Sequence, residues 1–185
     1  MAADEQPQRI TQRGLYFDEL QTGVVYQHTP GRTMTEADNT IFSTLTMNHQ
    51  ALHLDAAWSA TNALGGERLM NSMHTLSTLI GLSVNQLTQS TIVAQLGFSE
   101  VSFPKPVFAG DTLYAETEVL EKRESKSRPG QGIVSMRHTG RNQDGDVVVV
   151  AVRSALFHLS PEAKDAAGAG GADAGADANR GERQA

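Results

Sequence analysis

The feature that most constrains the fold is a long apolar segment without a charged residue, at residues 71–87. Apolar side chains recur in it at the three- and four-residue spacing of a helix. They are Met73, Leu76, Leu79, Ile80, Leu82, Val84 and Leu87. A helix that is apolar on more than one face and carries no charge is usually enclosed by other structure. We therefore predict a central helix over residues 71–87.

Runs of β-forming residues separated by turns follow this segment. Two short strands are predicted at residues 91–98 and 101–103, ahead of a proline-containing loop. Three long strands are predicted at residues 112–123, 132–142 and 147–159. An Asp-Gly pair between the last two supplies the positive φ angles that a tight hairpin requires. Long strands joined by tight turns form an antiparallel sheet, and a helix enclosed by such a sheet gives an α+β fold.

The chain ahead of the central helix predicts one strand and two shorter helices. The strand covers residues 23–28 and ends before Pro30. Thr33 or Thr35 can cap a helix over residues 36–45, and an aspartate lies three residues after Thr35, where a capping box has its acid. A second short helix is predicted from Asp55, its cap, to about residue 60.

Size and composition indicate one folded domain. The chain has 185 residues, of which 39% are hydrophobic, and this is enough to build a single core. Residues 1–12 are polar and patternless, and residues 163–185 are mostly small. We therefore predict a flexible N-terminal arm at 1–12, a single domain at 13–162 and a disordered C-terminal tail at 163–185.

Charge, hydropathy and cysteine content exclude several classes of protein. A net charge of −6 argues against the basic face that nucleic-acid binding requires. The absence of cysteine excludes disulfides, thiolate metal sites and cysteine nucleophiles. The sequence has no run of about 18 apolar residues, and its N-terminus lacks the regions of a signal peptide. We expect a soluble cytoplasmic protein with no membrane partner.

The densest chemistry of the chain lies in residues 46–58, which hold two histidines, two amides, a carboxylate and the only tryptophan. Such side chains in a weakly periodic stretch indicate a loop that positions them. In one interpretation His53 is catalytic, Asn48 is its partner, and His49 contacts the substrate or faces solvent. In the other, a capped loop leads into a helix and His53 is only hydrogen-bonded. No third ligand accompanies the two histidines, so no metal site is predicted.

Three stretches are similar to motifs of one family. They are residues 42–53 (FSTLTMNHQALH), 68–73 (RLMNSM) and 103–113 (FPKPVFAGDTL). Over roughly residues 14–160, the chain resembles the MaoC-like dehydratases, the (R)-specific enoyl-CoA hydratase family. The resemblance implies a hot-dog fold, in which a long central helix is wrapped by an antiparallel β-sheet. It also implies an acyl-CoA substrate and a homodimer or higher homo-oligomer, because hot-dog sheets pair and complete their sites across the interface.

The chain departs from the family motif at informative positions. When the sequences are aligned on His53, the catalytic Asp of the family falls on Asn48 and a Gly falls on Met47. An amide cannot accept a proton at neutral pH, whereas a neutral imidazole can. His53 is then the principal base and Asn48 holds the water, unless Asp55 or Asp38 supplies a carboxylate. The chain resembles an Asn-bearing branch of the family that acts on CoA thioesters of the itaconyl and mesaconyl type.

Further roles follow from the resemblance for Ser72 and from side-chain chemistry for the other candidates, each with a structural alternative. The backbone N–H of Ser72 would polarise the thioester carbonyl at the start of the central helix. Asn71 is a candidate substrate contact, or only the N-cap of the helix. Arg68 is a candidate partner for a substrate carboxylate or a surface residue, and Trp58 lines a pocket or belongs to the core. The basic residues of the hairpin contact the CoA phosphates or are only solvated; they are Arg123, Lys126 and Arg128. No cofactor is expected beyond CoA as part of the substrate.

The predicted function is that of a hydro-lyase that reversibly hydrates an α,β-unsaturated acyl-CoA, with a short or branched dicarboxylic acyl group. One alternative is a hot-dog acyl-CoA thioesterase. Those enzymes use a carboxylate near the central helix, and the absence of Asp and Glu from residues 72–87 counts against it. The other alternative is a non-catalytic acyl-CoA-binding subunit, for which Met47 and Asn48 provide the argument.

Overall fold

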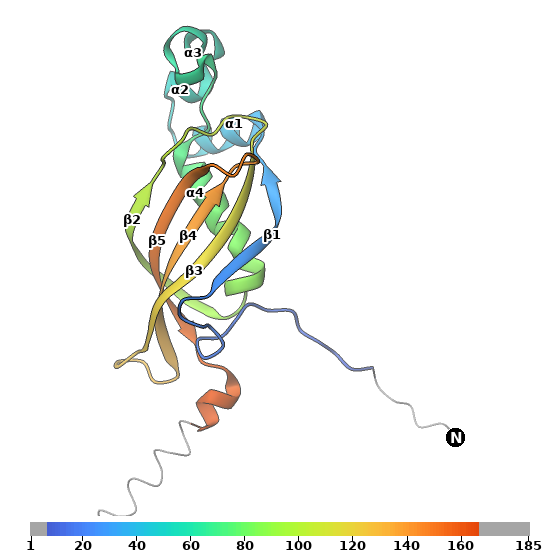
Figure 1. The fold of residues 1–185 in the computed structure, drawn as a ribbon, viewed down its shortest axis with the longest axis vertical. Helices are drawn as coiled ribbons and strands as arrows, with labels where there is room; N and C mark the ends of the chain where they lie inside the picture. The colour runs from blue at the N-terminus through green and yellow to red at the C-terminus, as the bar shows by residue number, and fades with distance from the viewer. Residues whose placement is uncertain (1–6, 167–185) are drawn as a thin grey trace, which may run out of the picture.

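A computed structural model describes residues 7–166 of the chain. Five antiparallel strands form one sheet in the order β1-β3-β4-β5-β2, and the sheet curves around a long helix (Figure 1). The strands are β1 (Val25–Thr33), β2 (Ile92–Ser102), β3 (Thr112–Glu124), β4 (Gln131–Arg141) and β5 (Val147–His158). The predicted α+β architecture, a hot-dog fold with a central helix wrapped by an antiparallel sheet, is confirmed.

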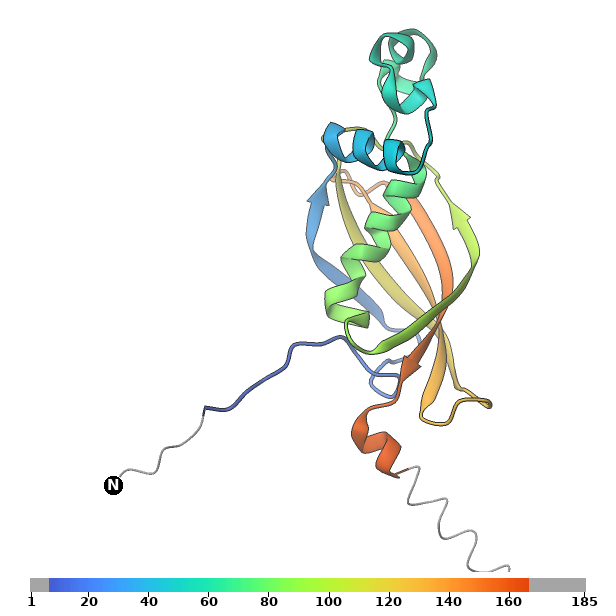
Figure 2. The same ribbon diagram turned by 180° about the vertical axis from the view of Figure 1, so that it is seen from behind.

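The central helix is α4 (Ser72–Ser83), which continues into the π-helical turn η2 (Val84–Thr88). It runs across the concave face of the sheet, as Figure 2 shows from behind. Leu79 on this helix is fully buried, together with Leu113 of β3 and Val149 of β5. Enclosure accounts for the apolar residues on the sheet side of the helix, while its outer face, which includes Met73 at 49% exposure, is uncharged but open. Within residues 7–166 no helix is long and apolar enough to cross a bilayer.

Two strand boundaries differ from the prediction. Strand β1 continues through Pro30 to Thr33, with a register shift between His28 and Arg32. Proline is tolerated there because β1 is an edge strand, on which one side needs no ladder hydrogen bonds. Strand β2 is one continuous strand, because register shifts between Ile92 and Glu100 absorb the irregularity that the sequence suggested would divide it.

Four short helical elements lie beyond one end of the sheet. They are α1 (Glu36–Leu45), α2 (Ala51–Leu54), α3 (Ala56–Asn62) and η1 (Leu64–Gly66), with α2 and α3 projecting furthest (Figure 1). Thr35 and Asp38 form the predicted capping box, and Asp55 accepts a hydrogen bond from Trp58 N at 2.9 Å as the predicted cap of α3. Helix α2 was not predicted, since four residues are too few to show a period.

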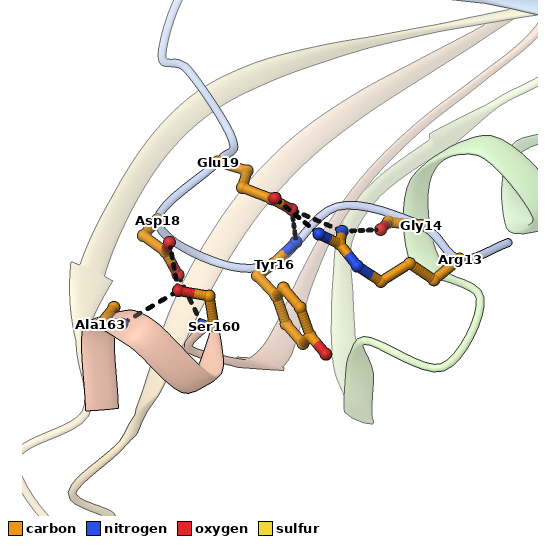
Figure 3. Close-up of polar contacts among 7 residues, drawn as sticks. All are labelled: Arg13, Gly14, Tyr16, Asp18, Glu19, Ser160 and Ala163. Atoms are coloured by element: carbon orange, nitrogen blue, oxygen red, sulfur yellow. Dashed lines mark hydrogen bonds and ion pairs between the residues drawn. The ribbon is translucent and has the colours of Figure 1, made fainter. Parts of the chain in front are cut away.

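Segments 13–19 and 160–163, from near the two ends of the described chain, lie side by side (Figure 3) at the end of the sheet opposite to α2 and α3 (Figure 1). Arg13 forms two hydrogen bonds of 2.7 Å with Glu19. Asp18 accepts hydrogen bonds from Ser160 N and Oγ at 2.7 and 2.8 Å. Residues 161–166 form a helical turn, of which 163–166 fall in the predicted tail. Residues 1–6 of the predicted arm and 167–185 of the predicted tail lie outside the described residues.

A row of polar side chains divides the core into two apolar clusters. One cluster centres on Phe157 and Leu87, and the other on Leu79 and Val149. Between them, hydrogen bonds run from strand to strand across the whole sheet. The row comprises Gln95 (β2), Arg153 (β5), His138 (β4), Thr117 (β3), His28 (β1) and Gln86 (η2), at successive distances of 2.7, 2.8, 2.8, 2.8 and 3.2 Å.

The direction of donation along this row follows from its first member. Arginine can only donate, so Nε2 of His138 accepts from Arg153 and its Nδ1–H donates to Thr117. The Thr117 hydroxyl then donates to Nε2 of His28, and Nδ1–H of His28 donates to Gln86. A proton added to Nε2 of His138 would place two donors against each other, so this imidazole is neutral.

Burial also disfavours the protonated forms of His28 and His138. Burial, followed by the charge of Arg153, lowers the pKa of His138 well below its usual 6.5. Burial also lowers the pKa of His28, although its hydrogen bond to Gln86 acts in the opposite direction. Burial lowers the pKa of the Arg153 guanidinium to about 10, so this group stays charged at neutral pH.

We expect folding stability to depend on pH through His28 and His138. Below pH 6.5 the unfolded chain binds protons at both histidines more readily than the folded chain does, so stability is present in full above pH 6.5 and falls as the pH decreases below it. The fall is at most about 1.4 kcal/mol per pH unit for each histidine. Urea unfolding between pH 7.5 and 5 measures it.

A matched pair of variants assigns the effect. In His138→Gln the amide can still accept from Arg153 and donate to Thr117, and the pH dependence should become weaker, because the histidine with the strongly lowered pKa is removed. His49→Gln, at an exposed position, should retain the full dependence. Equal slopes for the wild-type protein and His138→Gln would contradict this assignment.

Candidate active site

The segment after α1 reverses direction at a left-handed residue. Thr46 is the C-cap of α1, Met47 has φ 57°, and Asn48 N donates to Ser43 O at 2.9 Å. A positive φ at a residue other than glycine costs about 1–2 kcal/mol. Met47 aligns with a glycine of the family motif, so the chain keeps the turn without the residue that favours it. This turn places the Asn48–His53 segment beside α1.

His53 lies in α2 with its side chain held in one orientation. The residue is 7% exposed, and its Nδ1 is 2.9 Å from the carbonyl oxygen of Leu69. Because a carbonyl only accepts, Nδ1 carries the hydrogen and Nε2 of the neutral ring is left with its lone pair. A fixed neutral imidazole of this kind can act as a general base. The predicted loop is therefore a short helix that presents His53.

Asn48 is partly buried, and its hydrogen bonds are local. Its Oδ1 is 3.4 Å from Gln50 N, which is a long hydrogen bond. Among residues 7–166, no hydrogen bond joins the Asn48 side chain to His53. Their common action on a water molecule therefore remains a prediction.

The N-terminus of α4 offers one free backbone donor at its first residue. Asn71 is the N-cap, and its Oδ1 accepts from Met73 N at 3.0 Å. The N–H of Ser72, between them in sequence, has no acceptor within the part of the chain that the structure describes. Unpaired N–H groups at a helix start, together with the positive end of the helix dipole, attract an oxygen that carries negative charge.

A cavity of about 270 Å³ opens beside Ser72. Its walls are mostly apolar, with hydroxyls at Ser72 and Thr75 and a cation at Lys105. The lining residues are Leu64, Leu69, Met70, Ser72, Thr75, Phe103, Pro104, Lys105, Pro106, Val107 and Val148. Leu69, whose carbonyl orients His53, is one of them. The base, the backbone donor and the cavity therefore belong to the same end of the molecule.

The other predicted site residues near this end have structural partners or face outward. Asn71 is 3% exposed and donates to Ser43 Oγ at 3.1 Å. Arg68 pairs with Glu36 at 2.8 Å and lines a separate cavity of about 170 Å³. Trp58 is 42% exposed on α3, and His49 is also exposed. None of these four residues lines the cavity beside Ser72.

The predicted CoA contacts lie elsewhere. Arg123, Lys126 and Arg128 are all exposed at the β3–β4 hairpin. In Figure 1 this hairpin is at the bottom of the sheet, while α2 and α3 are at the top. One chain therefore does not bring these cations together with Ser72.

Sequence reasoning missed two buried polar residues of α1. Asn39 is 3% exposed and Ser43 is fully buried, and both hydrogen-bond to Asn71. Their spacing of four residues places them on one face of α1. Two polar residues at this spacing among the apolar residues of a helix could have indicated them from the sequence.

Comparisons with known proteins agree with this architecture. A family model described as a MaoC-like domain matches residues 19–142, which is more than half of the chain. The chain belongs to the MaoC-like domain family. The mesaconyl-CoA hydratase of Cereibacter sphaeroides is 29% identical over 143 residues, covering 77% of this chain and 41% of that protein. The chain thus spans less than half the length of that relative.

Solved structures share the fold. A monoamine oxidase regulatory protein from Archaeoglobus fulgius matches with a TM-score of 0.72 at 32% identity, over 82% of this chain and 100% of its own. A conserved hypothetical protein from Mycobacterium tuberculosis, described as having a double hotdog fold, matches with a TM-score of 0.70 at 27% identity. That match covers 80% of this chain and 45% of the mycobacterial chain.

Proposed function

We propose that this chain is a hydratase domain that reversibly adds water to the double bond of an α,β-unsaturated acyl-CoA. The observation that carries the proposal is the His53 ring, held through Nδ1 by Leu69 O, at the same end of the fold as the free N–H of Ser72. A base and an oxyanion donor are the two groups that this addition needs. No cofactor takes part, and CoA belongs to the substrate.

The proposed reaction uses His53 twice. Nε2 takes a proton from water while the water oxygen bonds to the β-carbon, and the electrons of the double bond move to the thioester oxygen as an enolate. The Ser72 N–H stabilises that negative charge. The imidazolium then returns its proton to the α-carbon on the same face, which leaves a β-hydroxyacyl-CoA and a neutral histidine. Asn48 holds the water through its side-chain oxygen.

The acyl group is proposed to be short, and branched dicarboxylic of the mesaconyl or itaconyl type. A cavity of about 270 Å³ supports a short chain. The relative named mesaconyl-CoA hydratase supports the dicarboxylic group. Lys105 is the cationic residue of the lining, although it pairs with Asp146 at 2.6 Å.

We expect crotonyl-, itaconyl- or mesaconyl-CoA to lose its conjugated-thioester absorbance on incubation with the protein, without release of free thiol. His53→Ala should lower kcat by about 10²–10⁴-fold, the usual contribution of general acid–base catalysis. His49→Ala, at an exposed position, is the matched control and should retain activity. Thiol release would instead support a thioesterase, and neither signal would support a binding subunit.

The backbone donor can be removed without removing the helix. Residue 72 is the first residue of α4, where proline is well accommodated, and Asn71 has ψ 123°, which suits a residue before proline. Ser72→Pro should therefore fold and lose about 10²–10³-fold in kcat, the usual loss when one oxyanion donor is removed. Ser72→Ala retains the N–H and should keep most of the activity. Equal kinetics for the two variants would exclude the proposed role.

We further propose that a second hot-dog domain, from another copy of the chain, pairs along β2. This strand is a sheet edge with one unpaired side, and Leu96 and Phe98 on it are 51% and 44% exposed. The relative of about twice the length and the structure described as a double hotdog fold support a paired arrangement.

Light scattering coupled to size exclusion should give the mass of a dimer or a larger assembly. Phe98→Lys should shift the protein toward the monomer, because it places a charge in the proposed interface. Val25→Lys, at a 51% exposed position on the opposite edge strand, should not change the mass. A monomeric wild-type protein at micromolar concentration would contradict the proposal.

A further inference from the structure

We propose that Asn39 is a positioning residue that holds His53 in fixed relation to the N-terminus of α4. This inference rests on the proposed hydratase function for its consequence in catalysis. Its structural basis is one side chain that contacts three segments: the His53 backbone, Leu69 and Asn71.

Both N–H groups and the oxygen of the Asn39 amide form hydrogen bonds. The Nδ2 group donates to His53 O at 3.2 Å and to Leu69 O at 3.0 Å, and Oδ1 accepts from Asn71 N at 2.8 Å. The residue is 3% exposed. A buried amide with both N–H donors and its oxygen in use has a single orientation.

The acceptor that orients the base is shared with Asn39. Leu69 O receives the Nδ1–H of His53 at 2.9 Å and an N–H of Asn39 at 3.0 Å. A carbonyl oxygen has two lone pairs, and these two donors use both. Asn39 therefore fixes both the backbone from which the imidazole projects and the oxygen that selects its tautomer.

The third contact reaches the oxyanion donor. Asn39 Oδ1 holds the backbone N–H of Asn71, the residue directly before Ser72. Ser43, one turn further along α1, holds the Asn71 side chain at 3.1 Å. The two residues together anchor the start of α4 to α1, so the Ser72 N–H cannot move freely relative to His53.

Asn39 is 3% exposed, and both N–H groups and the oxygen of its amide are already bound to other segments of the chain. It lines the separate cavity of about 170 Å³ near Arg68. Its action on the reaction therefore passes through the three segments that it holds.

Asn39→Asp tests this role. The side chain keeps its shape, but an acceptor oxygen replaces the NH₂ group that donates to His53 O and Leu69 O. We expect kcat to fall by about 100-fold with KM changed much less, since a displacement of about 1 Å of catalytic groups has a cost of this order. The acid limb of the kcat–pH profile should move upward, because a carboxylate near His53 favours its protonated form. Asn39→Ala, which adds no charge, should lower kcat without that upward shift.

Two controls separate positioning from stability. Asn62→Asp makes the same change at an exposed asparagine that also donates to a backbone carbonyl, and should leave kcat unchanged. Val134→Ala lowers stability in the apolar cluster at the far end of the sheet and should change kcat only by the fraction of protein unfolded. An Asn39 variant that behaves like Val134→Ala would reduce Asn39 to a structural residue and overturn the proposal.

An activity-independent measurement separates this proposal from the proposed function. Nitrogen NMR of the His53 ring should report one Nδ1–H tautomer in the wild-type protein and a mixture of ring states in Asn39→Asp and Asn39→Ala. An unaltered His53 signal in both variants would overturn the positioning role, whatever the activity. An altered signal in a protein without hydratase activity would support the positioning role and reject the function.

Discussion

The structure depends on the enclosure of a helix that carries no charge. Helix α4 is stable only where the concave sheet removes its apolar side chains from water, so the strands must curve around it. The helix N-terminus then emerges at the end of the sheet, where α1 lies across it and α2 and α3 project beyond (Figure 2). The electrostatic potential of the helix start and the chemistry of His53 are therefore brought together by a packing requirement, and the apolar core determines where the polar site forms.

Hydrogen bonds between side chains and the loop backbone hold that site together. Leu69 O and His53 O are both bound by side-chain amide or imidazole N–H groups, and the N–H of Asn71 is bound by a side-chain oxygen. Loop backbone that would otherwise need water is thereby satisfied by neutral side chains. The family motif has a carboxylate where this chain has Asn48. Neutral amides at positions 39, 48 and 71 leave His53 as the one ionisable side chain of this set.

Local signals predicted most of the fold. The apolar period of residues 71–87, the Thr35 capping box and the Asp-Gly hairpin each depend on neighbours within a few residues, and all three are present. The sequence did not predict that β1 passes through Pro30, because tolerance of proline depends on the strand being an edge of the sheet. The role of Asn39 was missed because its partners are 14 to 32 residues away. The assignment of Arg123 to the same ligand as Ser72 came from the local positive charge of its segment, which carries no information on distance.

The polar row in the core has a consequence for how the sheet is assembled. A strand that slides by two residues keeps its apolar face toward the helix, so apolar burial alone distinguishes poorly between such pairings. In this sheet a slide of β4 or β5 would separate Arg153 from His138 and leave a guanidinium among apolar side chains. The row therefore penalises the mispaired sheets and specifies one alignment of all five strands, which the apolar clusters on either side could not do by themselves.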